Sequence, residues 1–137
     1  PKVFIDATDE CPELGEFVRF AAEVDGILAY AYLGDVTASV TGDKKAQKFE
    51  DDYLDELFEE IYRAGVRAVT YMPTRNTQEQ ILRLRALCGR YGMLQISGED
   101  INSPRQKFVI EKMKEAQFAN LIANTWRLIR HENGEKE

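Results

Sequence analysis

The stretch that decides the fold lies near the middle of the chain and reads Ala64-Gly65-Val66-Arg67-Ala68-Val69-Thr70-Tyr71-Met72-Pro73-Thr74-Arg75-Asn76-Thr77-Gln78-Glu79-Gln80. Gly65 stands where a helix ends in a left-handed cap, and residues 66–72 are an apolar run typical of a strand. Residues 73–76 predict the loop that leaves this strand, and Thr77 with Gln80 has the capping-box pattern that begins a helix. The order helix, strand, loop, helix indicates an alternating α/β chain.

The same order recurs on both sides of this stretch. We expect four strands, each followed by helical apolar spacing, at residues 3–5, 27–33, 66–72 and 93–96. The continuous apolar run at 27–33 favours a strand covered on both faces. Ser103-Pro104-Arg105-Gln106 predicts the start of the last helical region, which we expect to be broken near Glu115. Strict alternation predicts a parallel sheet with right-handed crossovers, in one domain over residues 1–132 with a frayed tail at 133–137.

Four β/α units do not close a barrel of eight. The chain therefore forms either a small open sheet or half of a barrel that another segment or a second chain completes.

Composition excludes several classes of protein. The 137 residues are 44% apolar and 31% charged, with a net charge of −6, and this acidic balance argues against nucleic-acid backbone binding as the main task. No apolar run approaches the roughly 18–20 residues that span a membrane, and no signal peptide is recognised at the start. We expect a cytoplasmic protein, in which Cys11 and Cys88 are small buried residues. The acids at 50–60 favour a solvated helix face.

Ligands of parallel α/β folds bind at the carboxyl ends of the strands. All four predicted strand ends are polar. They carry the following residues: Asp6, Thr8, Asp9 and Glu10; Tyr32, Gly34 and Asp35; Pro73, Thr74, Arg75 and Asn76; Ser97, Gly98, Glu99, Asp100 and Asn102.

The last of these ends, Leu94-Gln95-Ile96-Ser97-Gly98-Glu99-Asp100-Ile101-Asn102, resembles the closing motif of the PHP superfamily (polymerase and histidinol phosphatase). Residues 26–31 are similar to that family's Gly-apolar-x-Leu-Ala-His strand, and residues 64–71 and 77–80 to the helix, strand and helix between the two motifs. The resemblance spans roughly residues 12–104. It implies a metal-dependent phosphoesterase and the C-terminal half of a (βα)7 TIM-like barrel.

The resemblance assigns residues as well. Asp100 falls on a metal-binding Asp, which makes it the catalytic candidate, while Asn102 and Tyr30 replace two metal-binding histidines. The chain holds one histidine, His131, which we interpret as a solvated tail residue. The oxygen ligands that remain (Asp100, Glu99, Asp35 and Asp6) would hold Mg²⁺ or Mn²⁺ weakly.

Substrate-binding candidates are Arg75, Arg105, Asn102 and Tyr30. Arg75 could bind the phosphate of a phosphorylated small molecule beside the helix that begins at Thr77, or it could pair with an acid. Asp100 could instead accept backbone N–H groups in a turn, and Tyr30 and Trp126 could be packing residues.

Three functions follow. The chain is part of a PHP-type phosphoesterase, which attacks a phosphate ester with a metal-activated water. Alternatively, it is a non-catalytic binding or regulatory domain on that scaffold. The third alternative is an assembly unit, a homo-oligomer or the partner of a missing N-terminal half-barrel.

Overall fold

The computed structural model describes residues 11–36, 47–101 and 104–135. Its helices and strands, in chain order, are α1 (Leu14–Glu23), β1 (Ala29–Ala31), η2 (Asp51–Tyr53), α2 (Leu54–Ala64), β2 (Ala68–Tyr71), α3 (Gln78–Tyr91), β3 (Leu94–Ser97), η3 (Glu111–Lys114), η4 (Ala116–Phe118) and α4 (Ala119–Glu132). The three strands form one parallel sheet in the order β1-β2-β3. The α/β class with a parallel sheet is therefore confirmed for three strands, and the strand predicted at residues 3–5 lies outside the described residues.

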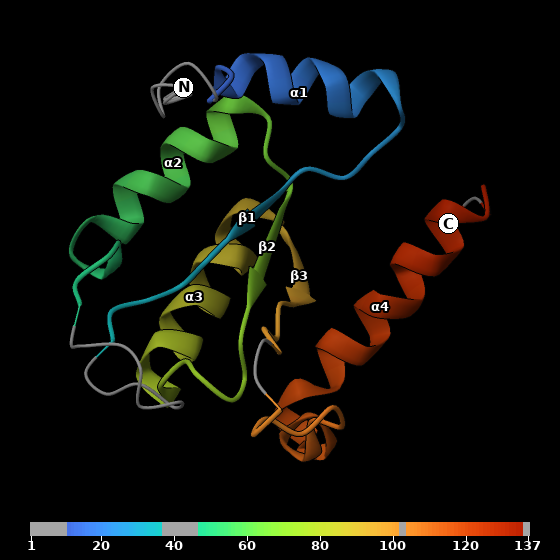
Figure 1. Cartoon of the computed structure of the whole chain (residues 1–137). Helices are drawn as coiled ribbons and strands as arrows, with labels where there is room; N and C mark the ends of the chain where they lie inside the picture. The colour runs from blue at the N-terminus through green and yellow to red at the C-terminus, as the bar shows by residue number, and fades with distance from the viewer. Residues whose placement is uncertain (1–10, 37–46, 102–103, 136–137) are drawn as a thin grey trace, which may run out of the picture.

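Helices α2 and α3 pack on one face of the sheet and enclose the hydrophobic core (Figure 1). Tyr30 and Val69 are register partners in β1 and β2, and Val69 pairs with Gln95 in β3. Because side chains alternate along a strand, these residues share the face that carries the core. The core is built from the following buried side chains: Tyr32, Leu54, Phe58, Ile61, Val66, Val69, Tyr71, Ile81, Leu84, Leu87, Cys88, Met93, Phe118 and Leu121.

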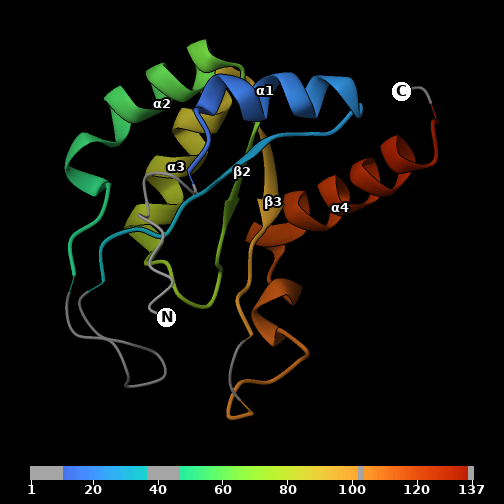
Figure 2. The ribbon, with the colours of Figure 1, turned by 45° about the horizontal axis from the view of Figure 1, so that its top comes forward.

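Helix α4 runs beside β3 at the edge of the sheet (Figures 1 and 2). Asn124 Nδ2 donates to the backbone oxygen of Gln95 at 2.8 Å, and Asn120 Nδ2 donates to the Gln95 side chain at 3.1 Å. The hydroxyl of Tyr71 also donates to that side chain. A side-chain amide thus satisfies a carbonyl at the sheet edge, which is one way a protein blocks unwanted strand pairing.

Helix α1 lies against the end of α2. A Cβ atom at Gly65 would sit 3.0 Å from the Val18 side chain, so the absence of a side chain at Gly65 permits this contact. Beyond the end of α1, the backbone oxygen of Asp25 lies 2.7 Å from Nε2 of His131 on α4. His131 is exposed, as expected for a solvated residue, but it belongs to α4 and not to a tail, and its ring contacts the turn that follows α1.

The predicted helix ends agree with the structure. Gly65 and Gly92 both cap their helices in the left-handed conformation, with φ of 109° and 63°. Thr77 and Gln80 make the reciprocal hydrogen bonds of a capping box. The break near Glu115 is also present, because this residue is extended between η3 and η4.

Other local predictions were wrong. The residues after Ser103 form turns, and the next helical segment begins only at Glu111. The strand predicted at 27–33 is reduced to Ala29–Ala31, whose residues are half-buried or exposed. Cys88 is buried but Cys11 is exposed, and Trp126 is exposed rather than part of the core. None of the helices in the described ranges is long and apolar enough to cross a membrane.

Candidate functional site

The carboxyl end of β1 is held by acids that precede α2. The Oε1 atom of Glu50 accepts the backbone N–H groups of Leu33 and Gly34, at 2.8 and 3.2 Å. Gly34 adopts φ of 71°, a conformation that favours glycine. Glu50 is almost completely buried. Backbone donors therefore satisfy this buried side-chain oxygen, as a buried polar group requires.

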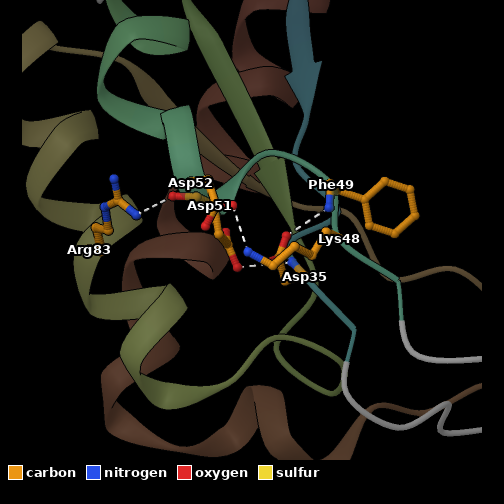
Figure 3. A network of polar contacts seen from close by, with 6 residues as sticks. All are labelled: Asp35, Lys48, Phe49, Asp51, Asp52 and Arg83. Carbon is orange, nitrogen blue, oxygen red and sulfur yellow. Dashed lines mark hydrogen bonds and ion pairs between the residues drawn. The ribbon is translucent and has the colours of Figure 1, made fainter.

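Asp51 is the centre of the polar network at this edge (Figure 3). Its carboxylate accepts the hydroxyl of Tyr32, the backbone N–H of Asp35 at 2.9 Å and Nε2 of Gln80 at 2.7 Å. Arg83 donates to its backbone oxygen at 2.6 Å. Three consecutive backbone N–H groups, at residues 33–35, are thus bound by two neighbouring carboxylates, which fixes the exit of β1 against the segment that leads into α2.

The network sets the protonation of its members. Burial raises the pKa of Tyr32, and the hydrogen bond to Asp51 raises it further, so the hydroxyl remains a donor. Burial also acts to raise the pKa of Asp51. The hydrogen bonds from Tyr32, Gln80 and Asp35 outweigh that effect, and the pKa of Asp51 lies below its ordinary value. Asp51 is therefore an ionised acceptor at neutral pH, not a proton donor.

The exit of β2 is a tight loop. The buried side chain of Asn76 accepts the backbone N–H of Met72 and donates to the backbone oxygen of Leu33, both at 2.8 Å. Thr74 donates to both oxygens of Glu99, from its backbone N–H at 2.8 Å and from its hydroxyl. Asn76 thus ties β2 to β1, and Glu99 ties β3 to β2.

Arg75 differs from its neighbours in this loop. Its guanidinium lies over the ring of Phe49, with Cζ 6.0 Å from the ring centroid. The Nη2 atom is shielded from solvent and has no hydrogen-bond partner in the structure described. Arg75 precedes the capped start of α3 by two residues, on the edge where parallel α/β proteins bind ligands.

The other predicted site residues are spread along this edge. Asp35 uses Oδ1 to accept the backbone N–H of Phe49 at 2.7 Å. Tyr30 lies on β1, where burial and the nearby Glu50 carboxylate raise its pKa. Asp100 and Arg105 lie in the segment after β3, where the backbone oxygen of Asp100 accepts Nε2 of Gln106. The predicted positions Asp6 and Asn102 lie outside the described residues.

These acids do not form a metal centre in the part of the chain that is described. Both oxygens of Glu99 accept hydrogen bonds from Thr74, and Asp35 accepts the backbone N–H of Phe49. Within residues 11–36, 47–101 and 104–135, no three His, Cys, Asp or Glu side chains are grouped closely enough to hold a metal ion. The fourth predicted ligand, Asp6, lies outside the described residues, so the Mg²⁺ or Mn²⁺ site that the PHP resemblance implied stays a prediction.

Two cavities open at this edge. One, of about 310 Å³, is lined by Asp35, Asp51, Thr77, Glu79, Gln80 and Arg83. The other, of about 260 Å³, is lined by Thr74, Glu99, Ile101, Gln106, Lys107, Val109, Ile110, Glu111 and Lys112. The second combines apolar walls with two lysines and two glutamates, so its charged lining is balanced.

The roles of Glu50, Asp51 and Gln80 were missed by the sequence reasoning, which placed the acids on a solvated helix face. One signal was present: Glu50 and Asp51 stand at the start of the helical region, as the N-cap and first residue of η2, and not along its exposed side. The partners of Glu50 and Asp51 lie 16 or more residues away and could not be predicted without the fold. No family model matches the chain, and neither a curated protein nor a solved structure matches it.

Proposed function

We propose that this chain is a non-catalytic domain that binds a phosphorylated small molecule at the carboxyl edge of its sheet, with Arg75 as the anion-binding group. The observation that carries the proposal is the buried Nη2 atom of Arg75 without a hydrogen-bond partner in the described structure. A buried donor left unpaired costs about 1–3 kcal/mol, and more when it is charged. An anion at this atom would remove that cost.

The surroundings of Arg75 support a phosphate more than a carboxylate-bearing protein partner. Arg is suited to phosphate because its planar guanidinium offers two parallel N–H donors. The positive end of α3 begins two residues later, and helix starts favour anions. The cavity of about 260 Å³ on the same edge is lined by Thr74, the neighbour of Arg75, and by two lysines and two glutamates. It offers room for the organic part of a small phosphate ester.

The phosphoesterase alternative has less support. It requires a cation at the strand ends, whereas Glu99 and Asp35 use their oxygens to hold loops together. The resemblance to PHP proteins rests on motif order and leaves the histidine positions filled by Tyr30 and Asn102.

The test is titration of the full chain with phenyl phosphate and with inorganic phosphate, followed by calorimetry. We expect Arg75→Gln to weaken binding at least about tenfold, equal to about 1.4 kcal/mol. Arg130→Gln is the matched control, because Arg130 is an exposed residue of α4 outside this edge, and its affinity should equal that of the wild type. Equal affinity for the wild type and Arg75→Gln would refute the proposal.

A parallel assay distinguishes a phosphoesterase from a domain that only binds phosphate. Wild type and Asp100→Ala are incubated with p-nitrophenyl phosphate and Mn²⁺. We expect no difference between them, since the domain is proposed to bind without hydrolysis. If the wild type hydrolyses the substrate and Asp100→Ala does not, the chain is a phosphoesterase and the proposed non-catalytic function is refuted.

A further inference from the structure

Helix α1 exposes an apolar stripe. Val18 contacts the end of α2 at Gly65, whereas Leu14, Phe17, Phe20 and Val24 remain accessible, with Phe17 and Phe20 at 47% and 62%. On a helix of 3.6 residues per turn these four positions fall on one side. Two exposed phenylalanines on a single helix are uncommon on a monomer surface and mark a contact site.

Helix α4 exposes a second apolar stripe. Ile122, Trp126 and Ile129 follow one another at helical spacing and are 45%, 58% and 39% exposed. Leu121, about a quarter to a third of a turn away around the helix, belongs to the core. The two stripes therefore face solvent, although α1 and α4 converge where His131 meets Asp25 (Figures 1 and 2).

The charges beside the two stripes are opposite. Around α1 the chain carries Glu13, Glu16 and Glu23 against Arg19, and within α4 it carries Arg127 and Arg130 against Glu132. Two α1 stripes placed together would bring acids into contact with acids. An α1 stripe placed on an α4 stripe would bring acids opposite arginines, which favours that pairing.

We propose that two copies of this chain associate through these stripes, with α1 of each copy on α4 of the other. A two-fold axis beside the point where α1 and α4 converge generates both contacts at once, and two-fold dimers are the commonest symmetric assembly. The three aromatic side chains expose roughly 300 Å² per copy, given about 150–250 Å² for each complete side chain. The four aliphatic side chains and the charged borders extend this area toward the about 800 Å² that each partner contributes to a stable interface.

The test begins with sedimentation equilibrium of the full chain from about 1 to 100 µM. We expect a dimer for the wild type. Phe20→Asp and Trp126→Asp should each weaken dimerisation at least about 100-fold, because each places a charge in an apolar contact. Leu82→Asp is the matched control, since Leu82 is a similarly exposed apolar residue on α3, and this variant should remain dimeric. Circular dichroism melting confirms that each variant is folded.

Mixing identifies the pairing. An equimolar mixture of Phe20→Asp and Trp126→Asp contains one intact α1 stripe and one intact α4 stripe, so a mixed dimer should form where each variant alone does not. Loss of the dimer in Phe20→Asp with no effect of Trp126→Asp would mean an α1–α1 contact and would overturn the proposal. A wild type that is monomeric at 100 µM would also overturn it and would assign the stripes to another protein or segment.

Discussion

At Gly34, one added methyl group should lower the free energy of unfolding because the backbone conformation and the surrounding side chains leave no room for it. Its φ of 71° lies in the left-handed region, and a Cβ there would approach Gln80 Nε2 at 2.8 Å, the Tyr32 hydroxyl at 2.9 Å and Asn76 Nδ2 at 3.0 Å. The conformation alone costs about 1 kcal/mol or slightly more for alanine. Displacing two of the three polar groups from buried hydrogen bonds adds about 1 kcal/mol for each. We therefore expect Gly34→Ala to lower the free energy of unfolding by about 3 kcal/mol.

Two other glycines separate these contributions. Gly92 also has positive φ, 63°, but a Cβ there would meet nothing within 4 Å, so Gly92→Ala should cost only the conformational part, about 1 kcal/mol. Gly89 lies inside α3 with open space around it, so Gly89→Ala should stabilise the protein by roughly 0.5–1 kcal/mol. Urea unfolding followed by circular dichroism measures all three, with linear extrapolation to water. If Gly34→Ala loses no more stability than Gly92→Ala, the tight packing of the β1 exit is refuted.

Two further predictions concern titration and thiol chemistry. The folded pKa of Asp51 lies below its ordinary value of 3.8, so its contribution to stability is present above that value and is lost as pH falls through the folded pKa. Urea unfolding should therefore show that Asp51→Asn is less stable than the wild type at neutral pH and loses less stability between roughly pH 5 and pH 2. The same loss in both proteins would contradict the proposed hydrogen bonds of Asp51. Burial raises the pKa of the Cys88 thiol to about 12, while Cys11 is exposed. A thiol reagent at neutral pH should therefore modify Cys11 in the native protein and Cys88 only after unfolding. Rapid modification of Cys88 in the native protein would contradict its burial.

The features that the sequence predicted well are those decided by neighbouring residues. Thr77 and Gln80 are three residues apart and cap each other's backbone, and Gly65 and Gly92 end helices because glycine accepts positive φ at low cost. The same local reasoning failed at Ser103-Pro104-Arg105-Gln106, where a good helix start is followed by turns. A cap is effective only when the residues after it can bury an apolar face, and Phe108 in this segment is exposed.

The candidate site was predictable in place but not in detail. Parallel topology predicts that the strand ends share one edge, and Arg75, Glu99 and Asp35 do lie in loops at that edge. Which oxygen serves which donor depends on contacts between segments that are distant in sequence, such as Gln80 with Asp51 or Thr74 with Glu99. The acidic character of residues 50–52 suggested solvation, whereas the fold turned Glu50 inward to meet the backbone of Gly34.

The exit of β1 can also be considered as an anion-binding site that is occupied by carboxylates of the same chain. Three consecutive N–H groups converge there on two carboxylates, an arrangement that other proteins use to bind external anions in backbone nests. Because Glu50 and Asp51 are covalently attached, their effective concentration is high and dissolved anions cannot compete. Replacing both residues by glycine would leave the three N–H groups open to added formate or acetate. The affinity of this variant for these anions would report how strongly the N–H groups bind the carboxylates of Glu50 and Asp51.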